Sequence, residues 1–241
     1  MRFDFFRKCA SFRAGFRGLL AVACVAIAGQ RSSAAPILNV DFGASSSPVE
    51  TGFQAFGIAT GSVTGPVTKT LGGYDVTVAV GTTLTGTGTL TARDRAAPAA
   101  DSGAFTYSAL YRDFINPTTT SAMSIGVAGL TGNTQYKIGL YAYDNSNTKT
   151  ITFTDYTTGA AGNSGQVPFT AGATFTSNDQ FATFFNATTN SAGNLVFRAT
   201  SNSGGALISG LVIDSVPEPA SIGLMSLAAL ALYRRRRCSR V

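Results

Sequence analysis

Short strand-like runs separated by glycine-rich turns fill residues 36–216, and this pattern restricts the chain to the all-β class. In the clearest run Tyr136, Ile138 and Leu140 alternate with residues such as Lys137, as in a strand with one side against a core. No run has the 3.6-residue apolar period of a helix. The spacing of the runs is that of a sandwich or barrel. The candidate strands are 37–42, 63–70, 74–80, 83–91, 105–114, 122–127, 135–143, 148–154, 173–176, 180–185, 194–200 and 206–214.

The 241-residue chain is long enough for one such domain between two targeting segments. Its N-terminus has a basic start followed by a ten-residue apolar run, Leu19 to Ala28, which is too short to span a bilayer. Small residues within 28–35 offer cleavage sites. We therefore expect a signal peptide at 1–35, a single β-sandwich domain at 36–215 and a separate C-terminal segment at 216–241.

The basic character of the chain belongs to its two ends. The net charge is +6, yet eleven of the 18 Lys and Arg residues lie in 1–35 and 217–241. Residues 36–216 contain seven basic and ten acidic residues, a net charge of −3, and the basic residues are scattered along the sequence. Because nucleic-acid surfaces need clustered Lys and Arg, we expect no nucleic-acid partner.

The residue types needed for common catalytic centres are missing. The chain has no His, and its three Cys residues all lie outside 36–216. This composition excludes serine and cysteine triads and the usual zinc sites. Residues 36–216 contain one Glu and nine Asp, most of them in expected turns or at strand ends. We predict that the protein is not an enzyme and has no catalytic residues.

The C-terminal segment combines three elements in a fixed order. A proline-rich motif is followed by 14 uncharged residues, 220–233, and these by a basic cluster. As a helix the uncharged stretch would measure about 21 Å, which is short for a bilayer core, and the arginines favour the cytoplasmic side. The motif residues are Val216, Pro217, Glu218 and Pro219, and the cluster residues are Arg234, Arg235, Arg236 and Arg237.

This combination resembles the PEP-CTERM sorting domain. The resemblance implies processing at the Pro-Glu-Pro motif by an exosortase, a membrane peptidase of Gram-negative bacteria that secrete exopolysaccharide. The alternative is a single-span anchor that is never cut. The short apolar stretch favours the sorting signal, with a membrane-spanning helix present before processing.

Three phrases of the central domain resemble the jelly-roll sandwiches of the galactose-binding and malectin-like type. They are ILNVDFG at 37–43, GLTGNTQYKIGLYAYD at 129–144 and ALISGLVID at 206–214. The resemblance implies a single jelly-roll-like β-sandwich. Because many functions share one fold, it does not by itself imply sugar binding.

One segment is the candidate ligand face. Tyr141 and Tyr143 share a side of their expected strand, and packing in the core or on the sheet is the favoured interpretation of their rings. The alternative is that the rings stack on sugars, with Asp144, Asn145 and Asn147 following in the turn. The oxygen-rich turn would also suit calcium, although a turn stabilised by its own Asx side chains is the favoured interpretation. No other metal or cofactor is expected.

Two functions remain after these exclusions. The first is a non-enzymatic structural or adhesive protein of the cell surface or extracellular matrix, sorted through its C-terminal signal. The alternative is a carbohydrate-binding module that recognises exopolysaccharide. The expected partners are signal peptidase, exosortase and, before processing, the membrane.

Overall fold

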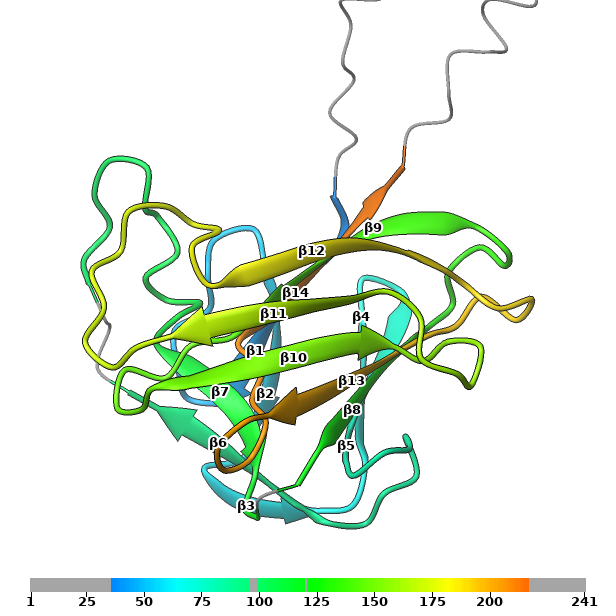
Figure 1. The fold of residues 1–241 in the computed structure, drawn as a ribbon, viewed down its shortest axis with the longest axis horizontal. Helices are drawn as coiled ribbons and strands as arrows, with labels where there is room; N and C mark the ends of the chain where they lie inside the picture. The colour runs from blue at the N-terminus through cyan, green and yellow to red at the C-terminus, as the bar shows by residue number, and fades with distance from the viewer. Residues whose placement is uncertain (1–35, 96–98, 120, 217–241) are drawn as a thin grey trace, which may run out of the picture. The chain divides into compact units, whose positions relative to one another are not determined.

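The computed structural model describes residues 36–95, 99–119 and 121–216 (Figure 1). This part of the chain contains fourteen strands and no helix, which confirms the all-β class. The predicted signal peptide, Pro217 to Pro219, the predicted apolar helix and the arginine cluster lie outside the described residues. The strands are β1 (Pro36–Ala44), β2 (Gln54–Ile58), β3 (Gly61–Thr64), β4 (Val67–Leu71), β5 (Tyr74–Val80), β6 (Thr89–Asp94), β7 (Asp113–Pro117), β8 (Met123–Ala128), β9 (Gln135–Tyr141), β10 (Lys149–Asp155), β11 (Ser164–Phe169), β12 (Ala182–Thr188), β13 (Leu195–Ser201) and β14 (Gly210–Ser215).

Eight strands form a jelly roll. Strands β1, β14, β9 and β12 are neighbours in one sheet, and β8, β13, β10 and β11 are neighbours in the other. The chain crosses from one sheet to the other between β8 and β9, between β9 and β10, and again at each step from β11 to β14. This is the double Greek-key connectivity of a jelly roll, and it confirms the predicted sandwich.

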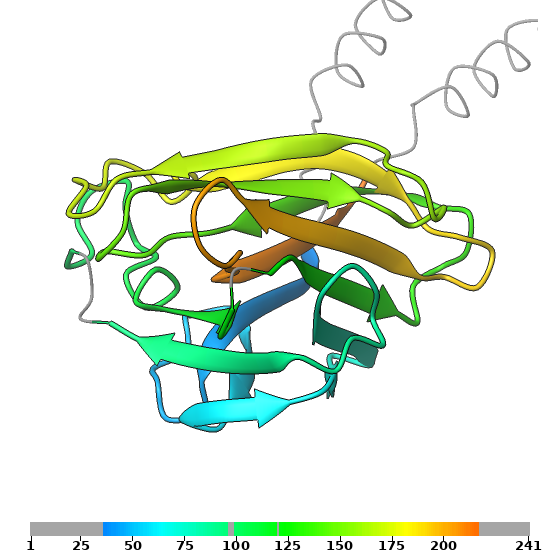
Figure 2. The same ribbon diagram turned by 60° about the horizontal axis from the view of Figure 1, so that its bottom comes forward.

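The chain between β1 and β8 adds strands to this framework. β2 extends the first sheet by parallel pairing with β1, and β5 with β4 extends the second sheet beside β8. The remaining three strands form a separate small sheet in the order β3-β6-β7, which packs against β1. In Figure 2 two strands of this small sheet, β3 in cyan and β6 in blue-green, appear at the bottom, below the layer that contains β10 and β13.

The core lies between the two large sheets and continues into a cluster of aromatic rings at one end. Phe197 of β13 is fully buried and meets Phe185 of β12 edge-on, with ring centroids 5.9 Å apart. At the end of β9 the ring of Tyr143 stacks on Phe181 at 4.8 Å, and Tyr111 packs beside them. Segments outside the strands therefore supply much of this aromatic cluster.

Some predicted strands differ from the observed ones. Residues 173–176 and most of 105–114 form turns and irregular segments, and residues 83–88 form a loop. The apolar residues of 105–111 alternate because they bury rings in the aromatic cluster, and this burial imitates the pattern of a strand. The expected strand 63–70 is divided at Gly65, which has a φ of 91°. Strands β2 and β11 were not predicted.

Candidate functional site

Strand β6 and the residue directly after it bring two arginines, Arg93 and Arg95, to one cavity. Side chains alternate along a strand, so Arg93 and Arg95 lie on the same side and Asp94 lies on the other. Asp94 accepts hydrogen bonds from Nε and Nη2 of Arg112 at 2.7 and 3.2 Å, and this contact lowers the pKa of Asp94. Asp94 thus neutralises the charge of Arg112, whereas Arg93 and Arg95 lie on the other side of β6.

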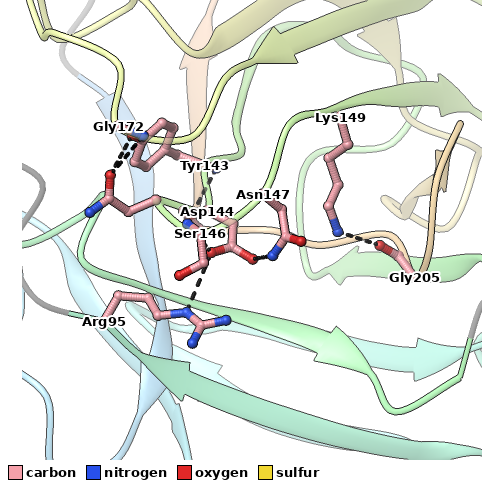
Figure 3. A network of polar contacts seen from close by, with 10 residues as sticks. Arg95, Tyr143, Asp144, Ser146, Asn147, Lys149, Gly172 and Gly205 are labelled. Atoms are coloured by element: carbon pink, nitrogen blue, oxygen red, sulfur yellow. Dashed lines mark hydrogen bonds and ion pairs between the residues drawn. The ribbon is translucent and has the colours of Figure 1, made fainter.

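The turn between β9 and β10 supplies the acidic side of the cavity. Asp144 is buried and accepts hydrogen bonds from the backbone N–H of Ser146 at 2.9 Å and from Nδ2 of Asn147 at 2.6 Å (Figure 3). Its Oδ1 lies 3.3 Å from Nε of Arg95. These contacts confirm the predicted Asx-stabilised turn. They also occupy both carboxylate oxygens of Asp144 with N–H donors, an arrangement opposite to the one a calcium ion requires.

Lys149, the first residue of β10, adds a third cation. Its Nζ donates to the carbonyl of Gly205 at 3.4 Å, and the side chain is half-buried. Burial lowers the pKa of Lys149; nearby Asp144 opposes this effect and Arg95 strengthens it. The ammonium group therefore lies in a partly desolvated position beside another positive charge.

These groups enclose a polar cavity of about 220 Å³. It contains three cationic side chains and a single carboxylate. Oδ1 of Asn116 is also buried there and has no hydrogen-bond partner. We name this cavity the basic pocket; its lining residues are Arg93, Arg95, Phe114, Asn116, Asp144, Asn147, Lys149 and Leu207. Its charge suits an anionic group, and its amides suit hydroxyls.

A larger cavity of about 420 Å³ also contains Lys149 in its lining. Its walls come from the paired ends of β10 and β11, from the loop before β12 and from Asn202 at the end of β13. Phe169 and Phe181 form apolar parts of the lining, and Gln180 and Asn202 contribute amides. One lysine thus borders two cavities at this end of the sandwich.

The predicted ligand face is only partly present. Tyr141 and Tyr143 are 3% and 0% exposed, so their rings pack in the core, as the favoured interpretation predicts, and do not form a surface stacking face. Their hydroxyls donate to Oδ1 of Asp179 at 3.1 Å and to Oδ1 of Asn145 at 3.0 Å. Asn145 also binds the N–H of Gly172 and so fixes a neighbouring loop. Of the five residues, Asp144 and Asn147 line the basic pocket.

Sequence reasoning missed the three cationic residues of the pocket. Arg93 and Arg95 have the two-residue spacing of neighbours on one side of a strand, and this spacing was the available signal. Lys149 was beyond prediction because the β9–β10 turn and the small sheet meet only in the folded chain. Three of the seven basic residues that look scattered in the sequence of 36–216 therefore line one cavity.

Comparisons with solved structures give weak likenesses to sugar-related proteins. A family 35 carbohydrate binding module from Clostridium thermocellum has 16% identity and a TM-score of 0.31, with 63% of this chain and 98% of that chain covered. The family 35 module from Paenibacillus barcinonensis has 13% identity and a TM-score of 0.30, with 65% and 99% covered. Bacteroides uniformis β-glucuronidase 2 has 15% identity and a TM-score of 0.34, with 74% and 18% covered. No curated protein matches the chain.

The C-terminal segment has a direct family match. Residues 215–237 match the family described as the PEP-CTERM protein-sorting motif, which confirms the resemblance seen in the sequence. Across the described ranges, no helix is long and apolar enough to cross a membrane. The match to a PEP-CTERM sorting motif implies exosortase processing and indicates an exported protein of the cell envelope.

Proposed function

We propose that the protein is a non-enzymatic component of the cell surface or secreted matrix that binds acidic polysaccharide through its basic pocket. In this proposal the sorting motif delivers the sandwich to the outside of the cell, and the pocket retains it where anionic sugars are present. The adhesive role and the carbohydrate-binding role predicted from the sequence are then one activity.

The observation that carries the proposal is the gathering of positive charge in an acidic domain. Residues 36–216 have a net charge of −3, yet three of their seven basic side chains line one pocket with a single carboxylate. Burial lowers the pKa of Lys149, and the positive charge of nearby Arg95 adds to this effect. A bound carboxylate or sulfate would relieve the repulsion between the two positive charges and accept charge-assisted hydrogen bonds.

The other groups of the pocket support a sugar as the carrier of that anion. The unpartnered Oδ1 of Asn116 can accept a hydroxyl hydrogen, and a buried acceptor gains most when such a donor arrives. The pocket is smaller than those that enclose drug-sized ligands. We therefore propose that it takes one sugar unit of a chain, while the rest of the chain lies outside.

The arrangement of carboxyl groups argues against glycoside hydrolysis. Most glycosidases use two carboxyl groups that flank the scissile bond, and Asp144 is the one carboxyl group in the basic pocket. Asp41 and Asp113 lie together elsewhere, beside a cavity of about 10 Å³ that has no room for a sugar. Binding without turnover is the expected behaviour.

Calorimetric titration with polygalacturonate and with neutral dextran tests this function. We expect the purified protein to bind polygalacturonate, and Lys149→Gln to weaken binding about tenfold because one charge-assisted contact is lost. Added salt should weaken binding further, since an anionic ligand is held partly by screened charge. Dextran should bind poorly.

The matched control is Lys69→Gln, which removes another half-buried lysine far from the pocket lining. This variant should bind as the wild type does. Equal loss in the two variants, or no binding of any acidic polysaccharide, would show that the basic pocket is not the site. Release of reducing sugar during the titration would contradict the non-enzymatic assignment.

A further inference from the structure

A second group of polar residues lies between β1 and the small sheet, and none of them lines the basic pocket. Asp41 of β1, Glu50 of the β1–β2 loop and Asp113 of β7 are 4%, 6% and 1% exposed. Buried carboxylates are costly unless they are paired or bind a cation. In the part of the chain that the structure describes, the two ion pairs are Arg95–Asp144 and Arg112–Asp94, and neither includes these three residues.

Backbone donors satisfy one of the three carboxyl groups. The Glu50 carboxylate accepts N–H groups of Thr51, Ala109 and Leu110 at 2.8, 3.2 and 3.4 Å. Asp41 accepts one bond from the N–H of Glu50 at 2.7 Å, and Asp113 accepts one from Ala44 at 3.1 Å. Asp41 and Asp113 thus each accept fewer hydrogen bonds than Glu50 does.

These two carboxyl groups border a cavity of about 10 Å³, the room of roughly one water molecule. Oδ1 of Asp113 is buried in its lining without a hydrogen-bond partner of good geometry, and the buried Ser47 hydroxyl lies beside the Asp113 carboxyl. Gly43 also lines the cavity, and a Cβ at this position would overlap the Asp113 carboxylate. The backbone of β1 therefore leaves room for an oxygen-lined space beside β7.

We propose that this cavity binds a single calcium ion between Asp41 and Asp113. Hard cations prefer carboxylate, hydroxyl and carbonyl oxygens, and every side-chain donor at the cavity is an oxygen. The described residues hold no group of three or more His, Cys, Asp or Glu side chains suited to a metal. Two carboxylates with Ser47 and backbone or water oxygens would give a weak site, of the 10⁻⁴–10⁻³ M class roughly typical of extracellular modules.

Burial and charge repulsion agree with this assignment. Burial raises the pKa of Asp41 to about 8, and nearby Asp113 and Glu50 add to the effect. Burial also raises the pKa of Asp113 to about 7. Each carboxyl group is costly to ionise on its own, and a divalent ion would offset this cost for both. The ion would also join β1 to the small sheet, which carries the arginines of the basic pocket.

Calcium binding is tested on the full-length protein after treatment with EDTA and removal of the chelator. Calorimetric titration with calcium chloride at pH 7.5 should show one ion per chain. In 5 mM calcium the midpoint of thermal unfolding should rise by about 5 °C over its value in EDTA. Asp113→Asn, which keeps the side-chain shape, should remove most of this rise and still unfold cooperatively in EDTA.

The control is Asp75→Asn, which changes an exposed aspartate on β5 and should leave the calcium effect intact. Asp41→Asn provides a second test if Asp113→Asn does not fold. A wild-type protein that neither binds calcium nor gains stability from it would overturn the proposal. An equal gain in wild type and both cavity variants would place the ion elsewhere and overturn it as well.

Discussion

At the residue scale, Asp41 and Asp113 connect the stability of the fold to pH. The folded pKa values, about 8 and about 7, lie above the value of 3.8 for a free aspartate. An acid whose pKa rises on folding stabilises the fold through its protonated form. That contribution is complete below about pH 4 and is lost as the pH rises through the folded pKa values.

We therefore expect the unfolding midpoint in EDTA to fall progressively between about pH 4 and pH 8 and to level off above that range. The groups around the two carboxyls are Glu50, Asp94 and Arg112, and the last two already form an ion pair. Thermal unfolding followed by circular dichroism at one-unit pH intervals measures the decline. Asp113→Asn should flatten it; an equally steep decline in that variant would mean that other groups are responsible.

The candidate site shows what single residues reveal before the fold is known. Asp144 and Asn147 could be identified because an Asx-rich turn after a strand has a local signature. The sequence could not show whether Tyr141 and Tyr143 are exposed, because the rings that cover them come from distant segments that include Tyr111 and Phe181. Alternation within one strand predicts two sides, but it does not predict what lies against each side.

At the element scale, regular strands were predictable and strands with unusual neighbours were not. Strand β5 agrees with its predicted range, and β8, β10 and β13 differ from theirs by one residue at each end. Strand β11 was missed because Gly165 and Pro168 weaken the strand signal in the sequence. Proline is compatible with β11 because this strand is at the edge of its sheet.

Two phenylalanines on neighbouring elements test the assignment of inside and outside. Phe197 of β13 is fully buried between the sheets, whereas Phe184 of β12 is 40% exposed. We expect Phe197→Ala to lower the free energy of unfolding by about 3–5 kcal/mol because it leaves a cavity. Phe184→Ala should cost about 1 kcal/mol or less. Urea unfolding measures both values, and similar losses would contradict the layer assignment.

At the scale of the whole molecule, the sandwich and the sorting motif are separable in sequence. The last strand ends at Ser215, and the matched motif covers 215–237. Every strand pair of the described structure therefore lies within 36–215.

Deleting residues 217–241 should accordingly change where the protein is found and leave its stability unchanged. We expect the deleted form to move from the envelope fraction to the medium, with an unfolding midpoint within about 1 °C of the untruncated protein. Cell fractionation with intact-mass measurement of each fraction tests the first part, and thermal unfolding tests the second. Unaltered fractionation would show that retention does not depend on the motif.

The antiparallel pairing of β1 with β14 has a mechanical consequence. Pro36 lies opposite Asp214, so both ends of the domain leave the sandwich at the same end of this sheet. Gly210, at the other end of β14, pairs with Tyr141, three residues before the aspartate of the basic pocket. If the tail is held and a polysaccharide pulls on the pocket, the force runs along β14. Its hydrogen bonds to β9 and β1 are then loaded in shear, so they resist the force together and do not break one after another.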